Sequence, residues 1–427
     1  MSLLLKNCRI VLTRNSCEYS ILQNVDIFIN ENRIEEIGKN LKEKTDEIID
    51  CSNKLVMPGL INMHTHSPMI LLRGYRDDQE LYDWLNDVWA VERKLKPKDI
   101  YIGTLMACLE MIKTGTVCFV DMYFHMNEVA RAVEETGIKA FLGYGMIDMW
   151  DKEKREFEIK ETLRFIKSIK DKETIKPVVA PHGVYTCSKE LLLEAKRISE
   201  EFNIPLTIHL SETRKEVYDT WKRYGKRPVE FLDEIKFLGK NVIAFHCSWV
   251  TKQEIKILAR NDVTVVSCPT SNMKLATGGA FPYREFKEAR ANICLGTDGA
   301  CSNNSLDMFR EMKFFALMQK WFRWNGREIT AQECLNLTTI NPAKVLNLNS
   351  GSIEEGKVAD IITLDLNHFS LLPVKNIISN LVYSTAGDCV SDIIINGELI
   401  IRDKKVLTVN EEKIKEKFEK TVEKLLD

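Results

Sequence analysis

Two histidines separated by a single residue, His64 and His66, are the first residues in this sequence whose spacing could do chemistry. They end an apolar run that begins at Leu55 and is typical of a buried strand. Alternate side chains of a strand share one face, so the two imidazoles are expected to point the same way. Such a pair is either half of a metal site, since imidazole suits zinc, iron and copper, or two polar residues at a strand end.

The other histidines favour the metal site. The chain has 427 residues and only 7 histidines. Five of them, and one aspartate, end short apolar runs typical of strands: His64, His66, His182, His209, His246 and Asp298. Catalytic metal sites use three or four protein ligands and keep one position for water. The sequence therefore predicts one divalent cation per chain, with zinc as the expected ion and iron as the alternative. The predicted ligands are His64, His66, His209 and Asp298.

Three further polar residues are expected around the cation. Glu212 follows His209 by three residues, so the turn after that strand can bring its carboxylate over the same cavity. A glutamate in this position is either a proton shuttle or a carboxylate that only stabilises the start of a helix. The predicted metal ligand three residues before it favours the proton shuttle. His246 is predicted to orient or deprotonate the attacking water, and His182 to donate a hydrogen bond to the substrate.

Alternating strands and helices must position these residues. From Pro58 onward, short apolar β runs alternate with amphipathic helices, which is typical of parallel strands joined by helical crossovers. Eight such runs can be counted up to Ile293–Leu295, enough to close a barrel. Active sites of such barrels lie at the C-terminal ends of the strands, where the histidines and Asp298 stand. The predicted fold class is therefore α/β, a metal-dependent (β/α)8 barrel over residues 58–350.

The two ends of the chain have a different pattern. Residues 1–57 and 351–410 are rich in short β runs, among them Ser379–Tyr383, and Asn396-Gly397 predicts a tight hairpin turn. The charged tail from Glu411 predicts a peripheral helix. The simplest arrangement is one small β-sandwich built from both ends, residues 1–57 as its first part and residues 351–427 as its second part plus the C-terminal helix.

The composition excludes several classes of protein. A formal net charge of −2 gives no electrostatic reason to expect nucleic acid or a membrane surface as a partner, and no apolar run reaches the length of about 18 residues needed to cross a bilayer. The 12 cysteines include no Cys-x-x-Cys pair, which predicts reduced thiols and a cytoplasmic protein. The aromatic residues Trp321, Phe322 and Trp324 are expected to pack inside, or, if exposed, to mark a subunit interface.

Five segments of the chain together resemble a known family. They are Pro58–His66, Pro181-His182 with Tyr185–Ser188, Ile208–Thr213, His246-Cys247, and Leu295–Gly299 followed by Ser302-Asn303-Asn304. In this order they resemble the amidohydrolase superfamily, and within it the methylthioadenosine/S-adenosylhomocysteine deaminases, including the archaeal type that favours 5'-deoxyadenosine. The resemblance extends over nearly the whole chain.

The resemblance implies hydrolytic deamination of an adenine nucleoside: 5'-deoxyadenosine, 5'-methylthioadenosine, S-adenosylhomocysteine or adenosine. Hydroxide would attack C6, Glu212 would protonate N1, and His246 with Asp298 would handle the proton of the water. Ammonia and an inosine-type product would leave. The resemblance also implies that Glu92 binds the ribose hydroxyls, that His182 contacts the purine, and that the protein is a homo-oligomer whose partner is a small nucleoside.

Departures from the family pattern concern the substrate and not the type of reaction. Cys268, in Cys-Pro-Thr-Ser-Asn, is similar to guanine deaminases, and Trp249 stands where relatives often have histidine. Where some members have an arginine that reaches the substrate, the polar candidate here is Tyr144, with Arg155 a poorer substitute. The alternative is therefore the same metal site acting on a free base or related heterocycle, such as guanine, a pterin or an s-triazine. A non-catalytic assembly module would have lost ligands that this chain keeps.

Overall fold

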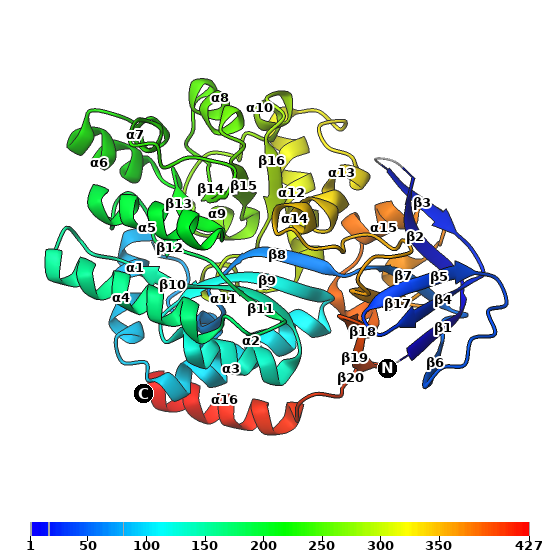
Figure 1. The fold of residues 1–427 in the computed structure, drawn as a ribbon. Helices are drawn as coiled ribbons and strands as arrows, with labels where there is room; N and C mark the ends of the chain where they lie inside the picture. The colour runs from blue at the N-terminus through cyan, green and yellow to red at the C-terminus, as the bar shows by residue number, and fades with distance from the viewer. Residues whose placement is uncertain (1, 16–17, 80, 427) are drawn as a thin grey trace.

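A ring of parallel strands surrounded by helices forms the larger part of the protein, and two small sheets lie beside it (Figure 1). The computed structural model describes residues 2–15, 18–79 and 81–426. The barrel strands are β8 (Leu60–Thr65), β9 (Thr116–Tyr123), β10 (Lys139–Met146), β11 (Ile175–Pro177), β12 (Ala180–Pro181), β13 (Leu206–Leu210), β14 (Val242–His246), β15 (Thr264–Ser267) and β16 (Asn292–Leu295).

The barrel closes through two junctions between its half-sheets. One half has the order β11-β10-β9-β8 and the other the order β13-β14-β15-β16, with parallel pairing throughout. Parallel bridges of Val179 with Leu206 and of Gly183 with His209 join β13 to the first half. At the other junction, the Asp298 N–H donates to the carbonyl of His64 over 2.9 Å. The predicted barrel is confirmed, and its closure brings the strand ends of residues 64 and 298 together.

Helices cover the outside of the barrel. They are α1 (Leu81–Glu92), α2 (Pro97–Lys113), α3 (Met126–Thr136), α4 (Lys152–Ser168), α5 (Lys189–Phe202), α6 (Arg214–Tyr224), α7 (Pro228–Glu234), α8 (Lys252–Arg260), α9 (Pro269–Lys274), α10 (Tyr283–Glu288), α11 (Ala300–Asn303), α12 (Met308–Arg323), α13 (Ala331–Asn336) and α14 (Ile340–Val345), with the 3-10 helix η1 (Ser67–Leu72). In α3, for example, Val129 and Val133 lie four residues apart and are buried, whereas Glu134 is exposed. This helix ends at Gly137, whose φ of 77° suits glycine.

Both ends of the chain contribute to the small sheets. One sheet has the order β5-β4-β1-β6 and the other the order β20-β19-β18-β17-β7-β2-β3. The strands are β1 (Ser2–Cys8), β2 (Ile10–Asn15), β3 (Glu18–Leu22), β4 (Val25–Asn30), β5 (Arg33–Gly38), β6 (Glu47–Asp50), β7 (Lys54–Pro58), β17 (Ile361–Asp365), β18 (Val390–Ile395), β19 (Glu398–Arg402) and β20 (Lys405–Val406). A separate core of buried residues, including Leu5, Ile27, Val56 and Ile361, lies in this unit. The expected small β unit from both termini is therefore present.

The apolar run that begins at Leu55 is two strands and not one. Its first part, β7, pairs with β2 and β17 in the small unit, and its second part, β8, is a barrel strand. Gly59 lies at the break, where a Cβ atom would come within 2.2 Å of the Val117 side chain. The sequence did not show the break because the residues on both sides of it, Leu55–Met57 and Leu60–Ile61, are apolar and buried.

The predicted strand at Ser379–Tyr383 is wrong, because this segment belongs to helix α15 (Ile377–Tyr383). The apolar residues Ile377, Leu381 and Val382 are buried on one side of the helix. The side chain of Asn376 caps its start by accepting the Ser379 N–H. Two 3-10 turns, η2 (Phe369–Leu371) and η3 (Gly387–Cys389), lie in the same region.

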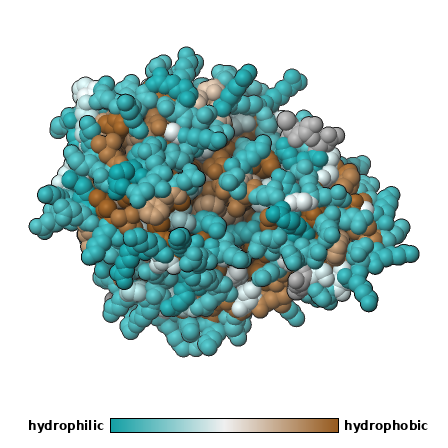
Figure 2. All heavy atoms as spheres, in the orientation of Figure 1, coloured by the Kyte–Doolittle hydropathy of each residue, from teal (hydrophilic) through white to brown (hydrophobic). Residues whose placement is uncertain are grey.

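The tail is a helix, α16 (Glu411–Leu426), and lies along the barrel helix α2 (Figure 1). The Lys113 ammonium lies 2.7 Å from the Glu411 carboxylate at this contact. The expected interior packing of the aromatic cluster is wrong for Trp321 and Trp324, whose exposed fractions are 77% and 95%. Figure 2 shows apolar side chains in hollows of one face that is otherwise mostly hydrophilic. None of the described helices is long and apolar enough to cross a membrane.

Candidate active site

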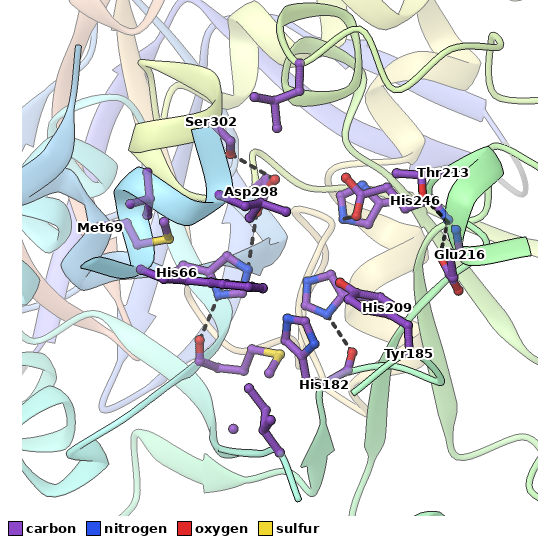
Figure 3. A pocket seen from close by; sticks show the side chains of 18 of the residues that line it. His66, Met69, His182, Tyr185, His209, Thr213, Glu216, His246, Asp298 and Ser302 are labelled. Atoms are coloured by element: carbon purple, nitrogen blue, oxygen red, sulfur yellow. Dashed lines mark hydrogen bonds and ion pairs between the residues drawn. The ribbon is translucent and has the colours of Figure 1, made fainter. Parts of the chain in front are cut away.

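A cavity of about 250 Å³ opens at the C-terminal ends of the barrel strands (Figure 3). Seven of the eight residues singled out from the sequence line it: His66, Glu92, His182, His209, Glu212, His246 and Asp298. The eighth, His64, is fully buried beside them. The structure therefore brings all eight residues to one place, although they are spread over more than 230 positions of the chain.

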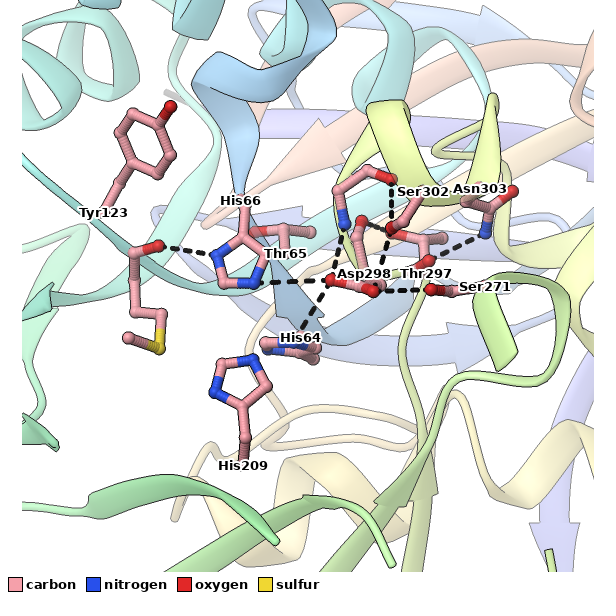
Figure 4. Close-up of polar contacts among 12 residues, drawn as sticks. His64, Thr65, His66, Tyr123, His209, Ser271, Thr297, Asp298, Ser302 and Asn303 are labelled. Atoms are coloured by element: carbon pink, nitrogen blue, oxygen red, sulfur yellow. Dashed lines mark hydrogen bonds and ion pairs between the residues drawn. The ribbon is translucent and has the colours of Figure 1, made fainter. Parts of the chain in front are cut away.

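The four predicted metal ligands form one cluster (Figure 4). The Nε2 atoms of His64 and His66 each lie 3.4 Å from Asp298 Oδ1. The ligand atoms of His64, His66 and His209 all lie within 4.8 Å of one another. Strand β8 supplies His64, the residue after it is His66, strand β13 supplies His209 and the loop after β16 supplies the aspartate. Three separate strand ends therefore converge.

Backbone carbonyls fix the orientation of two of the imidazoles. His66 Nδ1 lies 2.8 Å from the carbonyl of Met122, and His209 Nδ1 lies 2.8 Å from the carbonyl of His182. A carbonyl only accepts, so Nδ1 carries the proton in both rings and Nε2 keeps its lone pair. Burial lowers the pKa of His64 to about 3 and holds that of His209 well below its usual value. These histidines are thus in the neutral form that binds metal ions.

The burial and the donor atoms of this cluster fit a divalent cation. Both ring nitrogens of His64 are buried and have no hydrogen-bond partner among the described residues. Leaving a buried polar atom without a partner costs about 1–3 kcal/mol. A cation between Nε2 of His64, its histidine neighbours and Asp298 would remove this cost for one of the two nitrogens. Three imidazoles and one carboxylate are a donor set that suits zinc or iron.

Two serines orient the aspartate of this cluster. The Ser271 and Ser302 hydroxyls donate to Asp298 Oδ2 over 2.6 and 2.9 Å, so Oδ1 is left facing the histidines (Figure 4). Ser302 belongs to one of the segments that carry the family resemblance and Ser271 to the Cys-Pro-Thr-Ser-Asn departure, but the sequence gave neither serine a role. The spacing of Ser302, four residues beyond Asp298 at the start of α11, was the available signal.

Glu212 and His246 form a second pair of polar side chains beside the cluster. Glu212 Oε2 is 3.9 Å from His246 Nε2, and burial raises the pKa of the Glu212 carboxyl. Asn272 Nδ2 lies 3.2 Å from His246 Nδ1. An amide nitrogen donates, so Nδ1 accepts and the ring proton stands on Nε2, toward Glu212. Of the two roles expected for His246, orienting water fits this contact better than removing its proton.

Glu92, which also lines the cavity, is paired with a residue that the sequence did not reveal. The Tyr123 hydroxyl, at the end of β9, donates to Glu92 Oε1 at the end of α1. Both side chains line the cavity, and burial raises the pKa of Glu92. Nothing in the local sequence connects the two, because they are 31 residues apart on different elements.

His182 presents one ring nitrogen to the cavity. Its Nδ1 lies 2.8 Å from the Thr186 hydroxyl, and burial lowers the pKa of His182 to about 3. The ring is therefore neutral and its Nε2 stays available for a ligand.

The residues that depart from the family pattern do not line this cavity. Tyr144 lines a second cavity together with Phe157 and Phe165, and Arg155 Nε is 3.0 Å from Asp148 Oδ2. Strand alternation explains this placement, since Gly145, next to Tyr144, is the residue that faces the candidate site. Tyr144 and Arg155 are therefore not substrate-contacting candidates.

Trp249 and Cys268 also lie outside the lining of the candidate site. The Trp249 indole N–H donates to the carbonyl of Thr277 over 2.8 Å. Cys268 is fully buried.

A buried carboxyl beside Tyr144 leads to a prediction about pH. Burial raises the pKa of Glu158 to about 7, so the folded state binds a proton that the unfolded state releases above about 4.5. Stability from this group is complete below about pH 4.5 and is lost as the pH rises through about 7. Glu158→Gln should therefore be more stable than the wild type by about 1–3 kcal/mol at pH 8.5, with the advantage shrinking toward pH 5.

Urea unfolding at the two pH values measures this difference. Glu156→Gln, on an exposed position of the same helix, is the control and should show no such trend. A constant difference between wild type and Glu158→Gln across the pH range would contradict the prediction.

Comparison with known proteins extends these observations. The amidohydrolase family profile matches residues 55–400. The 5-methylthioadenosine/S-adenosylhomocysteine deaminase of Pyrococcus furiosus is 46% identical over 409 residues, which cover 95% of this chain and 97% of that protein. The 5'-deoxyadenosine deaminase of Methanosphaera stadtmanae is 47% identical over 395 residues, with 92% and 93% covered.

Solved structures of other deaminases are also similar to this chain. An adenosine deaminase from Xanthomonas campestris with bound zinc superposes with a TM-score of 0.93 and 28% identity, and 99% of this chain and 98% of that chain are covered. A guanine deaminase from C. acetobutylicum, at 22% identity and a TM-score of 0.84, shares the fold. From the matched family profile and the identities over nearly the full length, the chain belongs to the amidohydrolase family.

Proposed function

We propose that the protein is a metal-dependent hydrolytic deaminase that converts the 6-amino group of an adenine nucleoside to the inosine-type product and ammonia. The nucleoside is 5'-deoxyadenosine, 5'-methylthioadenosine, S-adenosylhomocysteine or adenosine. The observation that carries the proposal is one cavity lined by the exposed members of the histidine cluster, by Glu212 and by the Glu92–Tyr123 pair. In such a cavity a purine can meet Glu212 and the histidines while its ribose meets Glu92.

The proposed metal ligands are His64, His66, His209 and Asp298, and the proposed ion is zinc. A divalent cation held there lowers the pKa of water from 15.7 toward about 7. The support for zinc is the nitrogen-rich donor set and the zinc of the Xanthomonas campestris enzyme.

The chain's own side chains move the protons of the proposed reaction. Glu212, whose pKa is raised by burial, gives its proton to N1 as the water oxygen bonds to C6. Asp298 takes one proton of that water, and the His246 Nε2–H orients the oxygen. The Asp298 proton passes to the amino nitrogen, the bond from C6 to nitrogen breaks, and ammonia leaves. Glu212 recovers a proton from the new hydroxyl, which becomes the carbonyl of the product.

Removing the Tyr123 hydroxyl tests the proposed ribose end. In Tyr123→Phe, Glu92 loses a buried hydrogen-bond donor and its carboxylate is less well placed for the ribose hydroxyls. We expect the KM for the nucleoside to rise about 10-fold, with a smaller change in kcat. Tyr144→Phe is the matched control, because that hydroxyl belongs to the second cavity. Equal effects of the two substitutions on KM would contradict a role for Tyr123 in ribose binding.

A substrate panel tests the reaction itself. Ammonia release is measured for the zinc-loaded protein with adenosine, 5'-deoxyadenosine, methylthioadenosine, S-adenosylhomocysteine, guanine and a pterin. Activity on the nucleosides is the expected result. Activity on guanine or the pterin alone would overturn the nucleoside assignment and support the alternative, a deaminase of free bases.

We also propose that copies of the chain form a homo-oligomer. The exposed Trp321 and Trp324 side chains, with Phe322 nearby at 45% exposure, support an interface on α12. Light scattering behind size exclusion gives the mass directly. A monomer of 49.2 kDa at micromolar concentration would overturn this proposal.

A further inference from the structure

The turn between β13 and α6 carries Glu212 and is held in an unusual backbone conformation. Ser211 has φ of +50°, in the left-handed region that residues other than glycine seldom adopt. Such a conformation costs about 1–3 kcal/mol and persists only where surrounding contacts impose it. On one side, the Ser211 carbonyl accepts the N–H of Trp249 over 2.8 Å.

The other side of the turn is held by a single carboxylate, that of Glu216. Its Oε1 accepts the Ser211 N–H over 2.7 Å, and its Oε2 accepts the Glu212 N–H over 2.8 Å. The Glu216 N–H in turn donates to the Thr213 hydroxyl over 3.0 Å. Figure 3 shows Glu216 beside Thr213 at the wall of the cavity, on the same side as His246.

These contacts differ from an ordinary helix cap. Glu254 of α8 and Glu333 of α13 occupy the same third helical position and accept the N–H of the cap residue itself, Thr251 and Thr330. Glu216 reaches past its cap residue to the two residues before it. Its two oxygens therefore hold the turn that ends in Glu212. Capping the start of a helix does not require these two contacts.

Burial makes the ionised form of the Glu216 side chain energetically unfavourable. Glu216 is only 3% exposed, and burial raises the pKa of its carboxyl, whereas the backbone hydrogen bonds from Ser211 and Glu212 lower that pKa. No ion pair of Glu216 with a lysine, arginine or histidine is found within residues 2–15, 18–79 and 81–426. A buried acid beside a second buried acid, Glu212, is unfavourable unless it does something that an apolar residue cannot do.

We propose that Glu216 is a positioning residue for the reaction: it holds the backbone N–H groups of Ser211 and Glu212, and so aims the Glu212 carboxylate at the substrate ring. The proposal rests on the proposed proton transfer by Glu212. The side chain of Glu216 itself makes no contact with the reacting atoms in this scheme.

Glu216→Gln is the nearest change in shape. It puts an amide nitrogen, a donor, against one of the two backbone N–H groups, so one of the two contacts is lost. We expect wild-type zinc content, little change in KM and a fall in kcat of about 10- to 100-fold. Glu333→Gln is the matched control, because it alters the same helix position away from the cavity, and its kcat should stay at the wild-type value.

A double-mutant cycle separates positioning from a general loss of structure. If Glu216 acts through Glu212, Glu216→Gln should lower kcat in the wild-type background and have no further effect in the Glu212→Gln background. Equal losses in both backgrounds, or no loss in the first, would overturn the inference. If Glu212→Gln alone left kcat unchanged, the proposed proton transfer would fail instead, so the two failures can be told apart.

Binding provides a readout that needs no residual activity. A nucleoside analogue with a tetrahedral hydroxyl-bearing carbon in place of C6 and an N–H in place of N1 should contact Glu212, whereas the inosine-type product makes less use of it. Calorimetry on the zinc-loaded variants should show about 10-fold or greater loss of affinity for the analogue in Glu216→Gln, with product affinity kept. Unchanged affinity for the analogue would also overturn the inference.

Discussion

The Glu212→Gln variant is expected to bind one divalent cation per chain, as we also expect of the wild type, and to deaminate adenine nucleosides about 10²–10⁴-fold more slowly. Glutamine keeps the size of the side chain but has no proton to give to N1. Glu212 is not among the proposed ligands, and its Oε2 lies 3.9 Å from Nε2 of His246, which is not a proposed ligand either. The measurement is kcat for the best nucleoside of the panel, together with metal content by elemental analysis.

The Glu333→Gln control should match the wild type in both quantities. Normal turnover by Glu212→Gln would rule out the proton transfer to N1 through this residue. Loss of metal together with activity would instead make Glu212 part of the metal site.

The His209→Ala variant is expected to lose metal and activity together. Burial holds the pKa of His209 well below its usual value and its Nδ1 contacts the carbonyl of His182, so its Nε2 is the atom that can bind the cation. In the wild type, a cation at 100 times its Kd should stabilise the folded state by about 2.7 kcal/mol. In His209→Ala the melting temperature should respond little to added zinc. Elemental analysis and thermal unfolding with and without zinc measure both effects.

His368→Ala is the matched control for this experiment, since His368 lies at the start of η2, where its Nε2 is 3.5 Å from Asp388. It should keep the metal and its stabilisation. Full metal content in His209→Ala would show that the cation is held elsewhere.

Much of the fold could be predicted because barrel strands are buried on both faces and separated by amphipathic helices, a pattern that persists along the sequence. The prediction was wrong where the pattern alone is ambiguous. The apolar residues of Ser379–Tyr383 suit a strand locally, and only packing against α12 and α13 makes the segment helical. Likewise, the division of the run at Gly59 depends on β17, which comes some three hundred positions later.

The candidate site could be predicted as far as it depends on strand ends. Histidines at the C-terminal ends of parallel strands must converge when the barrel closes. Their positions at predicted strand ends were therefore sufficient to predict that they form one site. Contacts between different elements were not predictable in this way. The pairing of Tyr123 with Glu92 and the reach of Glu216 back to Ser211 depend on side-chain directions that composition and periodicity do not encode.

The pairing of β7 with β17 has a consequence for how the protein is made. Pro58 pairs with Ile361, and the strand that begins two residues after Pro58 carries His64 and is followed directly by His66. At a synthesis rate of about 5–20 residues per second, a ribosome needs about 15–60 s to travel from the first of these strands to the second. Throughout that time one edge of β7 has no neighbour and can pair with another nascent chain. A transcript that ends anywhere before β17 therefore yields chains in which this edge of β7 stays open, even when all four proposed metal ligands have been made.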